Sequence, residues 1–236
     1  MATIKKGSLS IGAFLALTFL GVLALIFSPV FGDGKNGLVY SDDMFNKLAK
    51  GSSYFIPKVA KSNEKYMNTT VIVPLKLDKP EQNPGAIKVL TAAGIQVSSS
   101  SEPQINVNLG TLMARILQDA DDMYKNDGKR ISDRYGVNEK EAMTSWWNIL
   151  KAMDKELKKQ GKIDESKIVS DVMKKAVEPA FNFYQIDAQK VADKAGTMTG
   201  LLVFYVIYTM WWGFAIFYIF DGIGLTMKKA KVKKEV

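Results

Sequence analysis

The side chains that could do chemistry in this sequence are carboxylates, hydroxyls, amines and aromatic donors, because the chain contains no histidine and no cysteine. Without those two residue types there is no Ser-His-Asp triad, no thiolate nucleophile, no iron–sulfur cluster and no imidazole-ligated metal. A metal site would need oxygen ligands alone, which suit magnesium, calcium or manganese. The sequence therefore predicts no resident cofactor, no metal centre and no catalytic residue.

Four acidic residues cluster between Asp119 and Gly128: Asp119, Asp121, Asp122 and Asp127. A calcium loop needs oxygen ligands at fixed alternating positions and a closing bidentate acid, and this cluster does not have that pattern. The spacing instead predicts a solvated helix end. Paired carboxylates elsewhere in the chain could cleave glycosidic bonds if they met in space, so a carboxylate-based, membrane-tethered hydrolase stays an alternative.

Two long uncharged runs predict which segments of the chain lie in a membrane and which lie outside it. The residues from Gly7 to Gly32 and from Ala195 to Phe220 each form a run of 26 without a charged side chain. Because a helix needs about 20 apolar residues to cross a bilayer, both runs are predicted transmembrane helices. The first is too long for the apolar core of a signal peptide and lacks an A-x-A cleavage site, so we expect a retained anchor.

Both short tails beyond these runs are basic. Lys5 and Lys6 precede the first run, and five lysines follow the second: Lys228, Lys229, Lys231, Lys233 and Lys234. The positive-inside rule places both termini in the cytoplasm and the central domain outside the cytoplasmic (inner) membrane, in the periplasm or its equivalent. The C-terminal lysines are predicted to hold anionic lipid head groups. Since topology accounts for much of the net charge of +8, we expect no nucleic-acid partner.

The second run is rich in aromatic residues, nine of the seventeen from Phe204 to Phe220. Tyr208, Trp211 and Trp212 fall near its middle, where their O–H and N–H donors need partners in a region without water. Packing against protein is favoured over simple contact with lipid, and a groove for an isoprenoid or quinone tail is the third alternative.

Gly196 and Gly200 form a GxxxG motif at the outer end of the same run, which would let two backbones approach closely. With Tyr208, Trp211 and Trp212, these glycines are the predicted interface for membrane-helix packing.

The central domain is predicted to begin with a small β-α-β-β-α unit. Its strands are Thr69–Leu77, Ile95–Val97 and Ile105–Leu109, its first helix carries Ala86 to Ala93, and a second helix follows Gly110. Beyond Tyr124 the pattern is helical, with an N-cap at Asn138, a stop at Gly161 and a new helix near Ile163.

From Ala180 to Phe220 the sequence has no strong helix-breaking signal, which predicts one rod of about 40 residues, or about 60 Å. An a/d-like seam would follow it through Phe181, Tyr184, Ala188, Val191, Ala195 and Met198.

The predicted fold is therefore two transmembrane helices, one at each end, flanking an extracytoplasmic α+β domain that consists of the β-α-β-β-α unit and a helical stalk. The predicted boundaries are a cytoplasmic tail over 1–8, transmembrane helix 1 over 9–31, membrane-proximal helices over 32–68, the β-α-β-β-α unit over 69–127, the stalk over 128–196, transmembrane helix 2 over 197–220 and a basic cytoplasmic tail over 221–236.

This layout, with the unit from Thr69 to Tyr124, resembles two ring-forming classes by architecture: polysaccharide copolymerases, and the ring-building modules of secretion and flagellar proteins. The second apolar run lacks the proline-rich stretch of the copolymerases. The resemblance implies self-association, and fold by itself does not fix function.

The predicted function is a non-enzymatic, membrane-anchored structural or assembly subunit that forms homo-oligomers or docks in a larger membrane complex, with membrane lipids as further partners. The alternatives are an accessory subunit of an electron-transfer or transport complex without its own redox centre, and the hydrolase.

Overall fold

The computed structural model describes residues 4–98 and 103–225, and the chain divides into two compact units. We call Met1–Phe45 together with Lys190–Val236 the helix-pair unit, and Asn46–Gln189 the central unit. The helix α2 (Gly37–Ser52) begins in the first unit and ends in the second.

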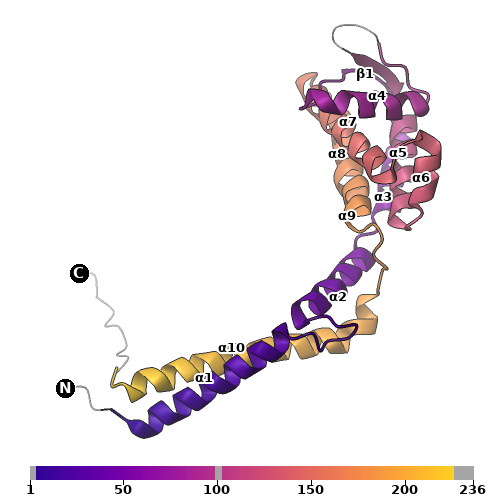
Figure 1. The fold of residues 1–236 in the computed structure, drawn as a ribbon. Helices are drawn as coiled ribbons and strands as arrows, with labels where there is room; N and C mark the ends of the chain where they lie inside the picture. Colours follow the sequence, from indigo (N-terminus) through magenta and orange to yellow (C-terminus); the bar gives the residue numbers. More distant parts are fainter. Residues whose placement is uncertain (1–3, 99–102, 226–236) are drawn as a thin grey trace, which may run out of the picture. The chain divides into compact units, whose positions relative to one another are not determined.

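The helix-pair unit is built from the two uncharged runs, which form α1 (Lys6–Phe27) and α10 (Val191–Gly222) (Figure 1). With 22 and 32 residues, both helices are long and apolar enough to cross a membrane. The second helix begins six residues earlier than the predicted transmembrane segment 197–220, because Lys194 and its neighbours are already helical.

At the C-terminal end of α1, a short loop leads into the first turn of α2. Asn36 caps α2, since its Oδ1 accepts the backbone N–H of Val39 at 2.9 Å. Lys35 pairs with Asp43 in the second turn of the helix. Gly37 sits so close to α1 that an added Cβ would lie 3.1 Å from the backbone oxygen of Ile26. The first turn of α2 is thereby held against the end of α1.

The central unit is mostly helical, with a two-stranded sheet. Its elements after α2 are α3 (Ile56–Asn63), η1 (Glu64–Tyr66), β1 (Thr70–Pro74), η2 (Pro80–Gln82), α4 (Asn83–Ala92), β2 (Gln104–Asn108), α5 (Leu109–Tyr124), α6 (Gly128–Tyr135), α7 (Glu139–Lys159), α8 (Ile163–Val172), the π-helix η3 (Met173–Val177) and α9 (Glu178–Asn182).

One hydrophobic core fills this unit, and α5 runs through it. Met113, Ile116, Ala120 and Met123 of α5 are fully buried, and the helix packs against α3, α6, α7, α8, η3 and α9. Gly110 allows the tight entry of α5, since an added Cβ would lie 2.6 Å from the backbone of Met67.

Over residues 4–98 and 103–225 the sheet has two strands, so the predicted three-stranded β-α-β-β-α unit needs correction. β1 and β2 pair antiparallel from Thr70 opposite Asn108 to Pro74 opposite Gln104. The expected strand at Ile95–Val97 makes one isolated bridge, between Val97 and Ile105. Gly94, with φ of +78°, ends α4 only three residues before Val97, which leaves too little chain for a ladder of bonds.

The predicted stalk and rod are also wrong. The helices from α6 to α9 share the core with α4, α5 and the sheet instead of forming a separate stalk. The helix expected from Ala180 to Phe220 ends at Asn182, and α10 begins only at Val191. Side chains from elsewhere bind the backbone between them: Lys50 Nζ donates to the carbonyl oxygens of Phe183 and Ile186, at 3.1 and 2.6 Å.

Two features hold this interruption in place. Asn126 Oδ1 accepts the N–H of Gln185 at 2.8 Å, and Gln185 itself has a left-handed φ of +65°. The predicted a/d-like seam across this segment therefore cannot lie on one helix.

Candidate functional site

The contact between α1 and α10 is the most extensive helix contact of the helix-pair unit, and it is antiparallel (Figure 1). Two glycines set the approach. A Cβ on Gly12 would lie 2.6 Å from the backbone nitrogen of Ile219, and one on Gly222 would lie 2.7 Å from Cα of Leu9. Because both glycines are buried, the two backbones meet closely near the chain ends of the two helices.

The aromatic donors of α10 find partners on α1. Tyr208 donates its hydroxyl to the backbone oxygen of Phe19 at 3.2 Å, and Trp211 Nε1 donates to that of Leu15 at 3.1 Å. The rings of Phe19 and Tyr208 stack at 4.1 Å, and Trp212 lies 4.6 Å from Phe19. The need for partners inferred from the sequence is thus met within the chain. The predicted contact of these residues with another subunit stays a prediction.

A polar cluster lies at the end of the helix pair that is formed by the start of α1 and the end of α10. Asp221 accepts from Lys5 Nζ at 2.6 Å and from the hydroxyl of Ser8 at 2.8 Å, and Lys5 N–H donates to Gly222 O at 2.9 Å. These bonds satisfy the carboxylate at the end of an otherwise apolar helix. The lysines predicted to hold lipid head groups, Lys228, Lys229, Lys231, Lys233 and Lys234, lie outside the described residues.

A second set of α10 residues, which we call the outward seam, is exposed at the surface of the helix-pair unit. It repeats at intervals of four and three residues: Gly196, Gly200, Val203, Ile207, Met210, Phe214 and Phe217. All seven are exposed, and an added Cβ on Gly196 or Gly200 would meet nothing within 4 Å. The predicted GxxxG motif is therefore on the surface, and the glycines used inside the chain are Gly12 and Gly222.

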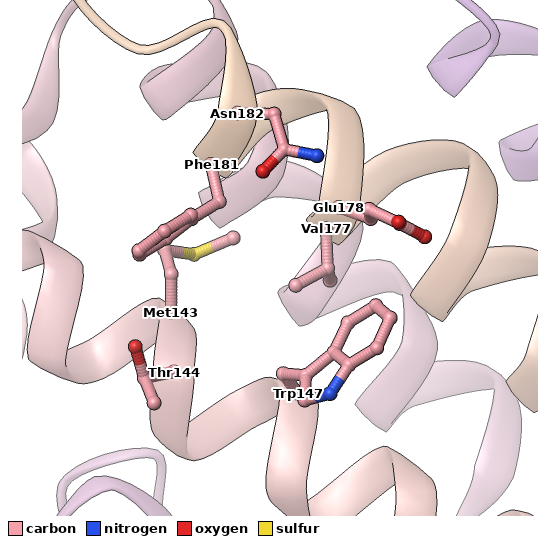
Figure 2. A pocket seen from close by; sticks show the side chains of 7 residues that line it. All are labelled: Met143, Thr144, Trp147, Val177, Glu178, Phe181 and Asn182. Atoms are coloured by element: carbon pink, nitrogen blue, oxygen red, sulfur yellow. The ribbon is translucent and has the colours of Figure 1, made fainter.

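The central unit has an open apolar pocket of about 360 Å³ between α7 and the segment η3–α9. Figure 2 shows Met143 and Phe181 on one side of it and Val177 and Trp147 on the other, while the carboxylate of Glu178 points away at the rim. Phe181 is 38% exposed. The pocket borders the π-helix η3, an irregularity that often accompanies functional sites. Its lining is apolar apart from Thr144, Glu178 and Asn182.

The aspartates expected at a solvated helix end are instead partly buried, and this expectation is wrong for two of the four. Asp119 is fully buried and Asp122 is nearly so. Asp119 accepts from Trp146 Nε1 at 2.9 Å, from the hydroxyl of Tyr135 and from the guanidinium of Arg134. Arg134 also reaches Asp122 at 3.3 Å.

The environment of this network changes the pKa values of Asp119 and Tyr135. Burial raises the pKa of Asp119, against the lowering effects of Tyr135, Arg134 and Trp146. Burial and the neighbouring Asp119 also raise the pKa of the Tyr135 phenol. The donors fill both oxygens of Asp119, so the carboxylate joins α5 to α6 and α7. Across the described residues, no group of acids is arranged to hold a metal ion.

Gly12, Gly222 and Lys50 were not among the residues predicted from the sequence. The two glycines lie 210 positions apart, but Gly12 has small residues four positions away on both sides, Ser8 and Ala16, and this small-xxx-small pattern is a signal that could have identified it. Lys50 is 3% exposed, a rare burial for lysine. Burial lowers the pKa of Lys50, with Asp187 opposing.

No protein-family model, no curated protein and no solved structure matches this chain. The geometry of the helix pair and of the central unit is therefore what supports a function.

Proposed function

We propose that this protein is a non-enzymatic, membrane-anchored assembly subunit. In this proposal α1 and α10 cross the cytoplasmic membrane as a hairpin, both termini lie in the cytoplasm, and the central unit lies on the extracytoplasmic side. The chain then self-associates through its membrane helices. The basic tails and the length of the apolar helices support the topology.

The observation that supports the proposal most directly is that two faces of α10 have different surroundings. One face, with Tyr208, Trp211 and Gly222, is occupied by α1. The outward seam begins with two glycines that have open space in front of them. Close glycine approach strengthens helix association in lipid, where apolar side chains alone gain little from meeting each other. A second copy of α10 would find on this seam the backbone access that α1 finds at Gly222.

Substitution of the two glycines tests this proposal. Gly196→Leu and Gly200→Leu add side chains where nothing in the chain is displaced, so the fold of the central unit should stay intact. The assembly, measured as native mass in mild detergent, should shrink toward the single chain. Gly213→Leu is the matched control, since Gly213 is also open but lies off the outward seam. An unchanged assembly in both variants would refute the seam as the contact.

The pocket of Figure 2 favours a second candidate, an accessory subunit that docks a different protein. Exposed apolar pockets on a water-facing surface are common at interaction sites. If this candidate holds, other chains should co-purify in fixed ratio, and Phe181→Asp should release them. If Phe181→Asp released no partner, the pocket would be ruled out as the docking site.

A further inference from the structure

The helix-pair unit contains a large apolar cavity that the proposed self-association contact does not use. It encloses about 1000 Å³ between the end of α1, the start of α2 and the first half of α10. Leu25 and Ile26 of α1, Leu38 and Phe45 of α2, and Leu202 and Tyr205 of α10 contribute to its walls. This volume reaches the upper end of the range for small-molecule sites.

The lining of the cavity defines the kind of occupant. Of its fifteen lining residues only four carry a polar side-chain group, and each of those is a hydroxyl. Leu38, Phe45 and Leu202 remain 54%, 47% and 64% exposed, so the apolar surface is not covered by the chain itself. Walls of this kind offer water few hydrogen-bonding partners, whereas a hydrocarbon chain matches them chemically.

The geometry of α10 places positive charge at one end of the cavity. Met198 lines the cavity, and Lys194 and Lys190 precede it at intervals of four residues, with Lys194 on the same face of the helix one turn away. Lys194 is also the last charged residue before the uncharged run that starts at Ala195. An anionic head group beside Lys194 would therefore have its hydrocarbon tail directed into the cavity.

The start of α2 packs closely beside the cavity. Gly37 would place a Cβ 3.3 Å from the ring of Phe31, and the ion pair of Lys35 with Asp43 fixes the first turns of α2. The wedge between α2 and the helix pair is thus built by close backbone contacts, so it exists before a ligand enters.

We propose that this cavity binds one acyl chain of an anionic phospholipid whose phosphate lies on Lys194. The inference rests on the proposed membrane function, since a bilayer must deliver the lipid laterally. It adds a specific lipid site on the side opposite the basic tail.

The test uses the full chain, extracted in mild detergent from its own membrane and washed extensively. Bound phospholipid is measured per chain by native mass spectrometry and by phosphate assay. The wild type should retain about one phospholipid, and Met198→Trp, which narrows the cavity beside Lys194, should retain about tenfold less. Val206→Trp adds the same bulk on a face that does not line the cavity, and should retain lipid like the wild type.

Lys194→Gln tests the head-group contact without changing the packing. It should reduce retention of anionic phospholipids, and Lys194→Arg should restore it. Equal retention by the wild type, Met198→Trp and Lys194→Gln would overturn the lipid site, as would a polypeptide held in the cavity in place of lipid. A membrane-bound oligomer without retained lipid would overturn this inference alone, whereas a chain recovered in the soluble fraction would overturn the proposed function as well.

Discussion

At the scale of single residues, Asp119 shows best what a sequence pattern leaves out. The four aspartates around it predict a solvated helix end. The prediction misses the burial of Asp119 because the side chains that bind it lie 15, 16 and 27 positions further along the chain. Only the packing of α5 against α6 and α7 brings Arg134, Tyr135 and Trp146 to one carboxylate. A buried acid with all its donors supplied is a structural joint between helices.

Removal of this carboxylate should destabilise the chain strongly. Asp119→Ala leaves the partly buried guanidinium of Arg134 without its main partner, and breaking a pair that involves a buried charge costs about 3–5 kcal/mol. Urea unfolding of the full chain in mild detergent, followed by circular dichroism, measures the loss. Asp133→Ala is the control, because Asp133 and its partner Lys129 are 65% and 83% exposed and should contribute less than about 1 kcal/mol. A similar loss in both variants would contradict the role of Asp119.

The raised pKa of Asp119 predicts a direction for the pH dependence. Since its folded-state pKa lies above the ordinary value of 3.8, the folded state keeps the proton over the interval between these two values. The contribution of Asp119 to the free energy of unfolding should therefore fall as pH rises through that interval, and stay constant above it.

Asp119→Asn removes the titration, so the wild-type free energy of unfolding minus that of the variant isolates the effect. Unfolding curves at successive pH values should give a difference that decreases with rising pH from 3.8 upward. A difference that increases with pH would mean that Arg134 stabilises the charged form more than burial destabilises it.

At the scale of elements, periodicity and capping signals predicted most helices. The N-cap at Asn138 is confirmed, with Asn138 Oδ1 accepting the N–H of Lys140 at 2.9 Å, and α8 begins at Ile163 as expected. The interruption after Asn182 was missed because its cause is Lys50, which is more than 130 residues away. Tertiary hydrogen bonds of this kind leave no local signal.

The close approach of α1 and α10 should fail when Gly12 gains a side chain. Gly12→Leu would place atoms within 3 Å of the Ile219 backbone, so the helices must separate locally. Because the chain has no cysteine, spin labels at Lys6→Cys and Ile223→Cys are unique probes of the distance between the helix ends. The distance should lengthen in Gly12→Leu and stay constant in Gly21→Leu, whose added Cβ meets nothing. An unchanged distance in Gly12→Leu would show that the pair does not depend on this contact.

At the scale of the whole molecule, the sequence predicted two apolar helices around a polar domain, and the structure has both. The antiparallel pairing of α1 and α10 was not predicted, because hydropathy identifies a helix without specifying its neighbour. Of the predicted interface, Tyr208, Trp211 and Trp212 lie against α1, and Gly196 and Gly200 face outward. The face of α10 that is open to another chain can be identified only once α1 is known to cover the opposite face.

This pairing, together with the proposed membrane topology, predicts which positions share a compartment. A membrane-impermeant maleimide added to the outside of intact cells should label a cysteine at exposed Lys129 in the central unit. It should leave cysteines at Lys6 and Ile223 unlabelled until the membrane is opened. Labelling of Lys6→Cys in intact cells would contradict the orientation, and labelling of all three positions in a soluble fraction would contradict membrane insertion.

The most direct test of the assembly proposal is the native mass of the wild-type protein, extracted gently from its own membrane. The proposal predicts one species whose protein mass is a multiple, greater than one, of 26.2 kDa. Extra chains in fixed ratio would instead identify an accessory subunit and point to the pocket beside Phe181. A single chain of 26.2 kDa at all concentrations tested would contradict self-association through the outward seam.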